Sequence, residues 1–180
     1  LEANCLLWQT SPTAAEIETR VPDWLRQMIG LDEDFTGVIQ DSASSAALMA
    51  VYASSETHSS VEKDAKVARI GRQFIRQIPV DADFAMRPDA LAEAIATDRA
   101  KSVTPALVVA TLNTMGVGAI DPLRAIGGIC QREGVFLHVD AAWAGSALIL
   151  NDYKWMIDGI KIVDSFIFNP HKWTLTNFDW

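Results

Sequence analysis

Cysteine and histidine are scarce in this chain of 180 residues, which has two cysteines and three histidines. No spacing among them suggests a metal site, and Cys5 and Cys130 do not look like a disulfide framework. A reducing cytoplasm is therefore the expected location. Long apolar runs are also lacking, because no segment reaches the about 18–20 consecutive apolar residues of a membrane span. Residues 1–5 show no secretory signal pattern.

Positive charge is in short supply as well. Fifteen Lys and Arg stand against 23 Asp and Glu, for a formal net charge of −8. Such an acidic chain has no electrostatic footprint for nucleic acid, so we expect neither a nucleic-acid nor a membrane partner. Hydrophobic residues make up 49% of the chain, which is enough for the core of one domain.

What the sequence does contain is an alternation of helical and strand-like segments. Helical periodicity or helix-end signals mark residues 13–29, 88–99 and 122–132, the last closed by Gly134. Buried strands are predicted at residues 107–112, 136–139 and 165–168. Helices between buried strands predict an α/β fold with a mostly parallel sheet covered by helices on both faces.

The most informative segment is residues 165–175, where an apolar strand stops at Asn169 and a lysine, Lys172, follows between a histidine and a tryptophan. A lysine held there is partly desolvated, which favours the neutral, nucleophilic amine. Nucleophilic lysines form Schiff bases with carbonyl compounds such as pyridoxal phosphate. Taken alone, the segment is better explained by an ordinary solvated loop lysine, because most lysines after strands are of that kind.

The second informative segment is the predicted strand at residues 136–139, which has a carboxylate, Asp140, at its carboxyl end. This carboxylate is costly to bury unless it meets a cation or hydrogen-bond donors, and a protonated pyridine nitrogen is one such cation. Small residues follow it, including Ala142, and would let a flat ring approach the backbone. The alternative is that Asp140 caps the following helix.

A third strand end lies at residues 37–44, where a predicted strand at 37–40 runs into a serine-rich helix start with Ser42 and Ser44. Helix N-termini bind phosphate through free N–H groups and the helix dipole, although an ordinary Ser or Asp cap is commoner. Ligands of open α/β sheets bind at the carboxyl ends of strands. Together the three strand ends match the phosphate, ring nitrogen and aldehyde of pyridoxal phosphate.

His58 lies at another junction between a strand, residues 52–55, and a helix, residues 61–70. A lone histidine is more often a surface or core residue, but this one is predicted on the same sheet edge as the other candidates. His138, inside a strand, is interpreted as structural.

With these segments in view, the chain resembles the pyridoxal-phosphate-dependent decarboxylases of aromatic amino acids, the group with DOPA, tyrosine and tryptophan decarboxylases. The likeness covers essentially the whole chain. It is carried by residues 7–12 with 16–18, and by residues 37–44, 57–62, 138–147 and 168–173. The resemblance implies the aminotransferase-like (fold type I) large domain, with pyridoxal 5'-phosphate as the cofactor.

The resemblance also implies roles for individual residues. Lys172 would hold the cofactor as a Schiff base, and Asp140 would pair with the pyridine nitrogen. Ala142 would pack on one ring face, with His58 stacked on the other, near the substrate carboxylate. The phosphate would be bound by Ser42, Ala43 and Ser44, with Asn169 and His171 assisting.

The implied reaction is decarboxylation of an aromatic L-amino acid to its amine, with Lys172, His58 and Asp140 as the catalytic residues. Family members are homodimers with active sites at the subunit interface. There Trp8 and Pro12 would line the substrate pocket of the neighbouring subunit. Two alternatives stay open, namely an aromatic aldehyde synthase of the same family and an inactive relative.

Several features depart from the family pattern. Asn113 stands where the family usually has Gly, Met115 replaces a Thr near the cofactor, and Pro22 falls inside the first predicted helix. Too few residues separate the helix start at 44 from the strand at 51 for a parallel crossover. We therefore expect residues 1–180 to form an incomplete large domain, with a helical stretch missing between 50 and 51 and further parts missing at both ends.

Overall fold

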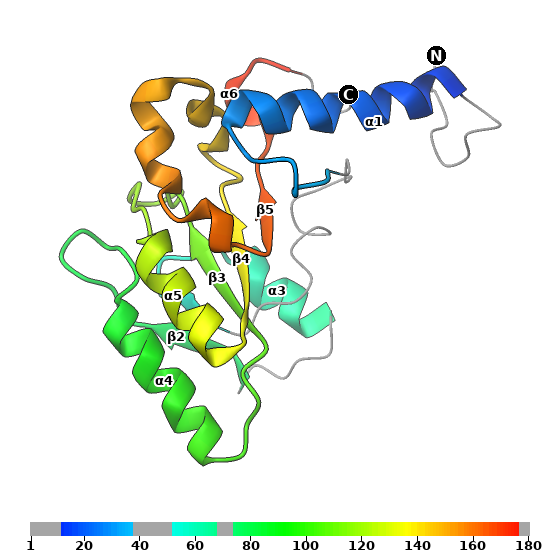
Figure 1. Ribbon diagram of the computed structural model, residues 1–180. Helices are drawn as coiled ribbons and strands as arrows, with labels where there is room; N and C mark the ends of the chain where they lie inside the picture. The colour runs from blue at the N-terminus through cyan, green and yellow to red at the C-terminus, as the bar shows by residue number, and fades with distance from the viewer. Residues whose placement is uncertain (1–11, 38–51, 68–73, 177–180) are drawn as a thin grey trace.

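The computed structural model describes residues 12–37, 52–67 and 74–176 (Figure 1). Its described strands form one sheet in the order β2-β1-β3-β4-β5, and all neighbouring strands are parallel. Their bounds are Tyr52–Ser54 (β1), Arg76–Ile78 (β2), Leu107–Thr111 (β3), Phe136–Asp140 (β4) and Ser165–Ile167 (β5). The sequence-based prediction of a parallel sheet is confirmed.

Helices connect these strands in the alternating pattern that the sequence predicts. The α-helices are Pro12–Ile29 (α1), Ser60–Val67 (α3), Pro88–Ala100 (α4), Leu123–Glu133 (α5) and Pro170–Trp173 (α6). Three 3-10 helices follow β4, at Gly145–Ile149 (η2), Asn151–Ile157 (η3) and Ile160–Ile162 (η4). Within the described ranges, none of the helices is long and apolar enough to cross a membrane.

Helix ends follow the local chemistry of the sequence. Pro88 begins α4, where the missing N–H of proline costs nothing because the first helical N–H groups have no partner within the helix. Gly134 ends α5 in the left-handed conformation, with φ 63°. Both helices confirm the prediction to within one residue at each end.

The two faces of the sheet are covered by different helices. Alternate side chains of β1, β3 and β4, such as Tyr52, Val108 and Leu137, pack with α4 and α5 in the main core. The intervening residues Ala53 and Val109 point the other way and pack with Val61 of α3. Figure 1 shows α3 on the far side of the sheet from α4 and α5, so the prediction of helices on both faces is confirmed.

The strand order indicates where a ligand would bind, namely between the carboxyl ends of β1 and β3. The chain adds β2 on one side of β1 but β3, β4 and β5 on the other, so its direction reverses between β1 and β3. Loops that leave neighbouring strands at such a reversal diverge to opposite faces and open a crevice at the carboxyl ends. The segments after β1 and β3 carry His58 and Asn113, respectively.

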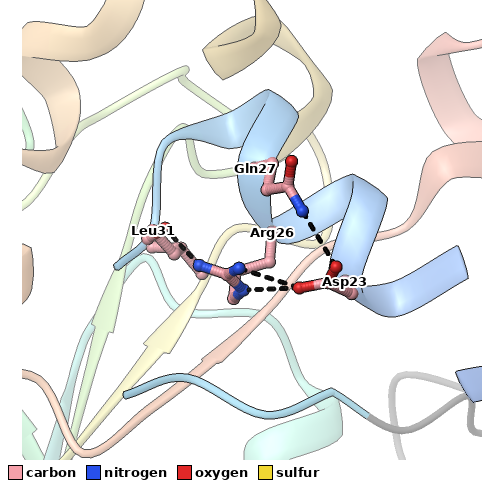
Figure 2. A network of polar contacts seen from close by, with 4 residues as sticks. All are labelled: Asp23, Arg26, Gln27 and Leu31. Carbon is pink, nitrogen blue, oxygen red and sulfur yellow. Dashed lines mark hydrogen bonds and ion pairs between the residues drawn. The ribbon is translucent and has the colours of Figure 1, made fainter. Parts of the chain in front are cut away.

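Helix α1 contains Pro22 in its interior, as the sequence predicts. The loop after the helix folds back so closely that a Cβ on Gly37 would lie 2.5 Å from the Pro22 Cβ. Arg26 ties the end of the helix together (Figure 2). Its guanidinium donates to Asp23 Oδ1 and to the carbonyl of Leu31, which stabilises the turn that follows.

The apolar residues that repeat with helical periodicity along α1, namely Ile17, Val21, Trp24, Leu25 and Met28, form a stripe that is only partly covered. Val21 and Leu25 are partly buried, whereas Ile17, Trp24 and Met28 are 54%, 57% and 47% exposed. The end of the helix is anchored through the buried side chains of Ile29 and, just beyond the helix, Leu31. The rest of α1 reaches out beyond the sheet (Figure 1).

The structure also differs from the sequence-based expectations. The edge strand β2 and the 3-10 segment after β4 were not predicted, and Phe136, expected in a buried strand, is 48% exposed. The short helix α6 was not predicted either. The predicted strand at 37–40 (beyond Gly37) and the helix start at 44 lie outside the described residues, as do 68–70 of the predicted helix 61–70.

Candidate active site

A cavity of about 70 Å³ opens among the segments that follow β1, β3, β4 and β5. An amine, a carboxylate, an imidazole, two hydroxyl groups, an amide and three largely apolar side chains converge on it. The lining residues are His58, Ser60, Thr111, Asn113, Met115, Asp140, Ala142, Trp143 and Lys172. They come from segments up to 114 positions apart in the sequence, between residues 58 and 172, and the pairing of the strands brings them together.

Lys172 reaches the cavity from the one-turn helix α6. Asn169 ends the extended segment, Pro170 starts the helix, and the Lys172 N–H donates to the Asn169 carbonyl at 3.1 Å. The Lys172 side chain is half-buried. Next to it, Trp173 meets Trp143 edge to face, with ring centroids 6.0 Å apart. This contact joins α6 to the turn after β4.

Asp140 is the last residue of β4, and a tight turn holds its carboxylate. Its Oδ1 accepts the N–H of Ala142 at 2.9 Å. The N–H of Ala141 donates to the Ile167 carbonyl of β5, and the N–H of Gly145 donates to the Ala141 carbonyl. A Cβ on Gly145 would lie 2.4 Å from the Phe168 Cβ, so the turn packs directly on the segment that leads to α6.

His58 lies between β1 and α3 and is held by Ser60. The His58 Nδ1 lies 2.9 Å from the Ser60 Oγ and accepts the Ser60 backbone N–H at 3.2 Å. The ring itself is exposed, whereas Ser60 is buried. The first turn of α3 therefore orients the imidazole at the edge of the cavity.

A chain of hydroxyl groups ties the His58 loop to the end of β3. The Ser54 Oγ lies 3.1 Å from the Thr57 Oγ1, which lies 3.5 Å from the Thr111 Oγ1. Ser54 and Thr111 are both buried. The loop position is thus set by the sheet beneath the cavity.

His138 lies one layer below Asp140 on the same face of β4. Its Nδ1 is 2.7 Å from the Ser165 Oγ of β5, and its Nε2 is buried without a hydrogen-bond partner among the described residues. Burial lowers the pKa of the imidazole, and the nearby Asp140 carboxylate raises it. His138 is buried inside the strand, as the structural interpretation predicts.

A buried carboxylate, Asp121, supports the wall of the cavity that is formed by the end of β3. Its two oxygens accept the backbone N–H groups of Met86 and Thr111, each at 2.7 Å. Burial raises the pKa of Asp121 to about 6, against the lowering effect of these two hydrogen bonds. Asp121 therefore fixes the strand end that carries the Thr111 hydroxyl.

Two departures from the family pattern, Asn113 and Met115, both line the cavity. Asn113 has φ 67°, a left-handed conformation that glycine adopts without strain and that asparagine tolerates better than most residues. That conformation explains the glycine expected at this position. Met115 is 54% exposed, so its thioether lies at the edge of the cavity.

Four of the predicted site residues, Lys172, Asp140, His58 and Ala142, are brought together around the cavity. Asn169 and His171 flank Lys172 in sequence but are not among the lining residues. Pro12 is the exposed first residue of α1 and also does not line the cavity. The predicted phosphate-binding residues Ser42, Ala43 and Ser44, and the predicted substrate residue Trp8, lie outside the described residues.

Sequence reasoning did not select Ser60, Thr111 and Trp143, which also line the cavity. The sequence held a clue to each of them. Ser60 follows His58 by two positions, and Thr111 lies near the end of a predicted strand. Trp143 follows Ala142 directly. In the part of the chain that the structure describes, no group of three or more His, Cys, Asp and Glu side chains is placed to hold a metal ion.

The parallel sheet, with an amine, a carboxylate and an imidazole at its carboxyl edge, matches solved pyridoxal-phosphate decarboxylase structures with a TM-score of 0.90, and it is an α/β domain of the fold type I class. The sequence model described as "Pyridoxal-dependent decarboxylase conserved domain" matches residues 49–180. The chain therefore belongs to the pyridoxal-dependent decarboxylase family.

Relatives agree with this assignment. The chain is 39% identical over 209 aligned positions to aromatic-L-amino-acid decarboxylase of Mus musculus, covering 96% of this chain and 43% of the relative. It is 38% identical over 201 positions to phenylacetaldehyde synthase of Arabidopsis thaliana, covering 96% and 41%. The crystal structure of Oryza sativa TDC with PLP and tryptamine matches with TM-score 0.90 and 34% identity, covering 94% of this chain and 41% of that chain. The chain thus spans less than half the length of these relatives.

Proposed function

We propose that the protein decarboxylates an aromatic L-amino acid to the corresponding amine and carbon dioxide, with pyridoxal 5'-phosphate as cofactor. The observation that carries the proposal is the convergence of Lys172, Asp140 and His58 on one cavity. The similarity to aromatic-L-amino-acid decarboxylases over 96% of the chain supports it.

The described side chains fit the cofactor chemically. Lys172 offers an amine for its aldehyde, Asp140 offers an anion for its ring nitrogen, and Ala142 leaves room for a flat ring. The predicted phosphate site at Ser42, Ala43 and Ser44 would add a further wall from outside the described residues. Asn169 and His171 stay candidates for assisting at the phosphate.

When bound, the cofactor supplies a carbonyl that takes up the substrate amine and a ring that withdraws electrons from the bond being broken. The chain's own residues position these parts. Lys172 would hold the cofactor through its aldehyde, and the Asp140 carboxylate, which the Ala142 N–H orients, would pair with the protonated ring nitrogen. His58 lies on the exposed side of the cavity, where its imidazole can face the substrate carboxylate.

Replacing Lys172 tests the proposal directly. Borohydride reduction of the full chain with the cofactor, followed by peptide mass spectrometry, should place a pyridoxyl group on Lys172. The K172A variant should carry none and should release no carbon dioxide from L-tryptophan, L-tyrosine or L-DOPA. Lys161→Ala, at an exposed lysine of η4, is the matched control and should keep both properties. Modification of another lysine would contradict the assignment.

An aromatic aldehyde synthase is the second candidate, because the chain is also 38% identical to phenylacetaldehyde synthase of Arabidopsis thaliana. Such an enzyme releases ammonia and peroxide as it decarboxylates. Measuring these products together with amine separates the two reactions. If no product is detected in any of these assays, the protein is an inactive relative that keeps the fold. Asn113 and Met115, which depart from the family pattern, would then account for the lost activity.

We also propose that the active protein is a homodimer with a shared active site, located in the cytoplasm. The uncovered stripe of α1, with Ile17, Trp24 and Met28 exposed, is suited to burial against a second copy. Trp8 and Pro12 of that copy would complete the substrate pocket. A free, buried thiol at Cys130 suits a reducing compartment. Analytical ultracentrifugation of the full chain should show a dimer, and Trp24→Glu should shift it to monomer.

Finally, we propose that residues 1–180 are an incomplete form of the large domain, lacking a helical stretch between 50 and 51. The alignment to the mouse relative spans 209 positions, more than the 180 residues of this chain, so that relative carries additional residues within the matched region. Inserting the corresponding residues of that relative between 50 and 51 should raise cofactor affinity. Unchanged affinity would argue against the interpretation.

A further inference from the structure

We propose that Ser60 fixes the imidazole of His58 as its Nε2–H tautomer and so acts as a positioning residue for the reaction. The inference rests on the proposed function for its catalytic meaning, but the tautomer itself is a property of the folded chain. Ser60 lines the same cavity as His58 and comes from the first position of α3.

The direction of the hydrogen bonds determines the tautomer. A backbone N–H can only donate, and the Ser60 N–H points at the His58 Nδ1 at 3.2 Å. Nδ1 must therefore be the unprotonated, accepting nitrogen, and the neutral ring carries its proton on Nε2. The Ser60 Oγ, 2.9 Å from the same nitrogen, then acts as a second donor.

The donor itself is rigidly placed. Ser60 is buried, and the turn around it is closed by bonds from the Val61 N–H to the His58 carbonyl and from the Lys63 N–H to the Ser59 carbonyl. On the other side of His58, the Thr57 hydroxyl lies between those of Ser54 and Thr111. The backbone on either side of His58 is thus held, by the sheet before it and by α3 after it, and the ring itself bonds to Ser60.

The tautomer decides what His58 offers a substrate. A neutral ring with the proton on Nε2 presents a hydrogen-bond donor without a full positive charge. Such a donor can orient a carboxylate oxygen. A full positive charge would stabilise the carboxylate most strongly before its charge is lost as carbon dioxide leaves, which would oppose the reaction. The fixed tautomer therefore suits a group that orients a carboxylate more than one that binds it tightly.

Nitrogen-15 NMR of the full chain labelled in histidine tests the tautomer without cofactor or turnover. The chain has only three histidines, so His138→Gln and His171→Gln variants suffice to assign the His58 signals. Wild type should show one pyridine-type nitrogen, Nδ1, and one pyrrole-type nitrogen, Nε2. A proton found on Nδ1 of the neutral ring would overturn the proposal.

Variants at Ser60 then test the cause. Ser60→Pro removes both donors at a helix position where proline is tolerated, and it should give a mixture of tautomers. Ser60→Ala keeps the N–H and should fall between this variant and wild type. Ser59→Ala is the neighbouring control and should match wild type. If both Ser60 variants keep the wild-type tautomer, Ser60 is not its cause.

Kinetics connects the tautomer to the reaction. Losing the Ser60 hydroxyl removes one orienting hydrogen bond, so Ser60→Ala should lower kcat about tenfold with a smaller change in KM. Ser60→Thr, which keeps the hydroxyl, should restore most of the rate. If wild type decarboxylates none of the aromatic amino acids although its tautomer is fixed, the proposed function fails and the tautomer assignment stands. Normal turnover of Ser60→Ala would instead refute the positioning role.

Discussion

Thr111 and Asp140 are register partners at the last positions of β3 and β4, and both line the cavity. Each strand end is fixed by a carboxylate: the Thr111 N–H donates to Asp121, and the Asp140 carboxylate itself accepts from the Ala142 N–H. Both walls of the site are thus held by hydrogen bonds from backbone N–H groups to aspartate side chains.

The buried carboxyl of Asp121 should make stability fall as pH rises. Its pKa is raised by burial from 3.8 to about 6, so the native state binds a proton more tightly than the unfolded chain does. Its stabilising contribution is therefore complete below about pH 3.8 and is lost as pH rises through about 6, a difference on the order of 3 kcal/mol. Urea unfolding across this range measures it. Asp121→Asn should flatten the profile; an unchanged slope would show that another group is responsible.

Asp98 should act in the opposite direction. It accepts from Arg76 of β2 and from the Tyr52 hydroxyl of β1, and its pKa is lowered chiefly by the Arg76 hydrogen bonds. A lowered pKa contributes stability above the ordinary value of 3.8, and this contribution is lost as pH falls through the native pKa. Asp98→Asn removes the buried carboxylate that pairs with Arg76 and should cost about 3 kcal/mol of unfolding free energy at neutral pH.

The control for Asp98→Asn is Asp89→Asn. Asp89 also pairs with an arginine, Arg87, but both side chains of that pair are about half exposed or more. Exposed ion pairs contribute little because water screens them. Chemical denaturation of the two variants should therefore separate them clearly, and equal losses would mean that burial of Asp98 is not the cause.

A methyl group on Gly145 should disturb the route to Lys172. The new Cβ would lie 2.4 Å from the Phe168 Cβ and 3.1 Å from the Ala141 Cβ, so the turn and the segment before α6 must move apart. Gly145→Ala should destabilise the fold by about 1–3 kcal/mol. Gly128→Ala, on an exposed position of α5 with open space around it, should instead stabilise the fold by about 0.5–1 kcal/mol. Thermal melts of both variants measure the two changes in stability. Cofactor binding to Gly145→Ala tests whether the position of Lys172 is disturbed.

Elements with a strong period and clear end signals were predictable from the sequence. Helices α4 and α5, with Pro88 at the start of one and Gly134 at the end of the other, lie within one residue of the predicted bounds. The edge strand β2 was missed because Arg76 and Gln77 break the apolar pattern of a buried strand. The exposure of the α1 stripe was missed because periodicity identifies an apolar face but not what covers it.

The site was predictable where chemistry is local to a strand end. Lys172, Asp140 and His58 each follow a strand, and a parallel sheet brings such positions to one edge. Ser60 and Thr111 could not be assigned in the same way because their contribution depends on hydrogen bonds made in three dimensions. The roles predicted for Ser42, Ala43, Ser44, Trp8, Pro12, Asn169 and His171 stay predictions.

The position of β5 at the sheet edge has a consequence for biogenesis. During synthesis the segment carrying His58 leaves the ribosome first, then β3, then β4 with Asp140, and Lys172 follows only after β5. A nascent chain therefore carries the imidazole and the carboxylate before the amine, and Lys172 can take up an aldehyde in this pocket only once β5 and α6 have emerged and joined the sheet.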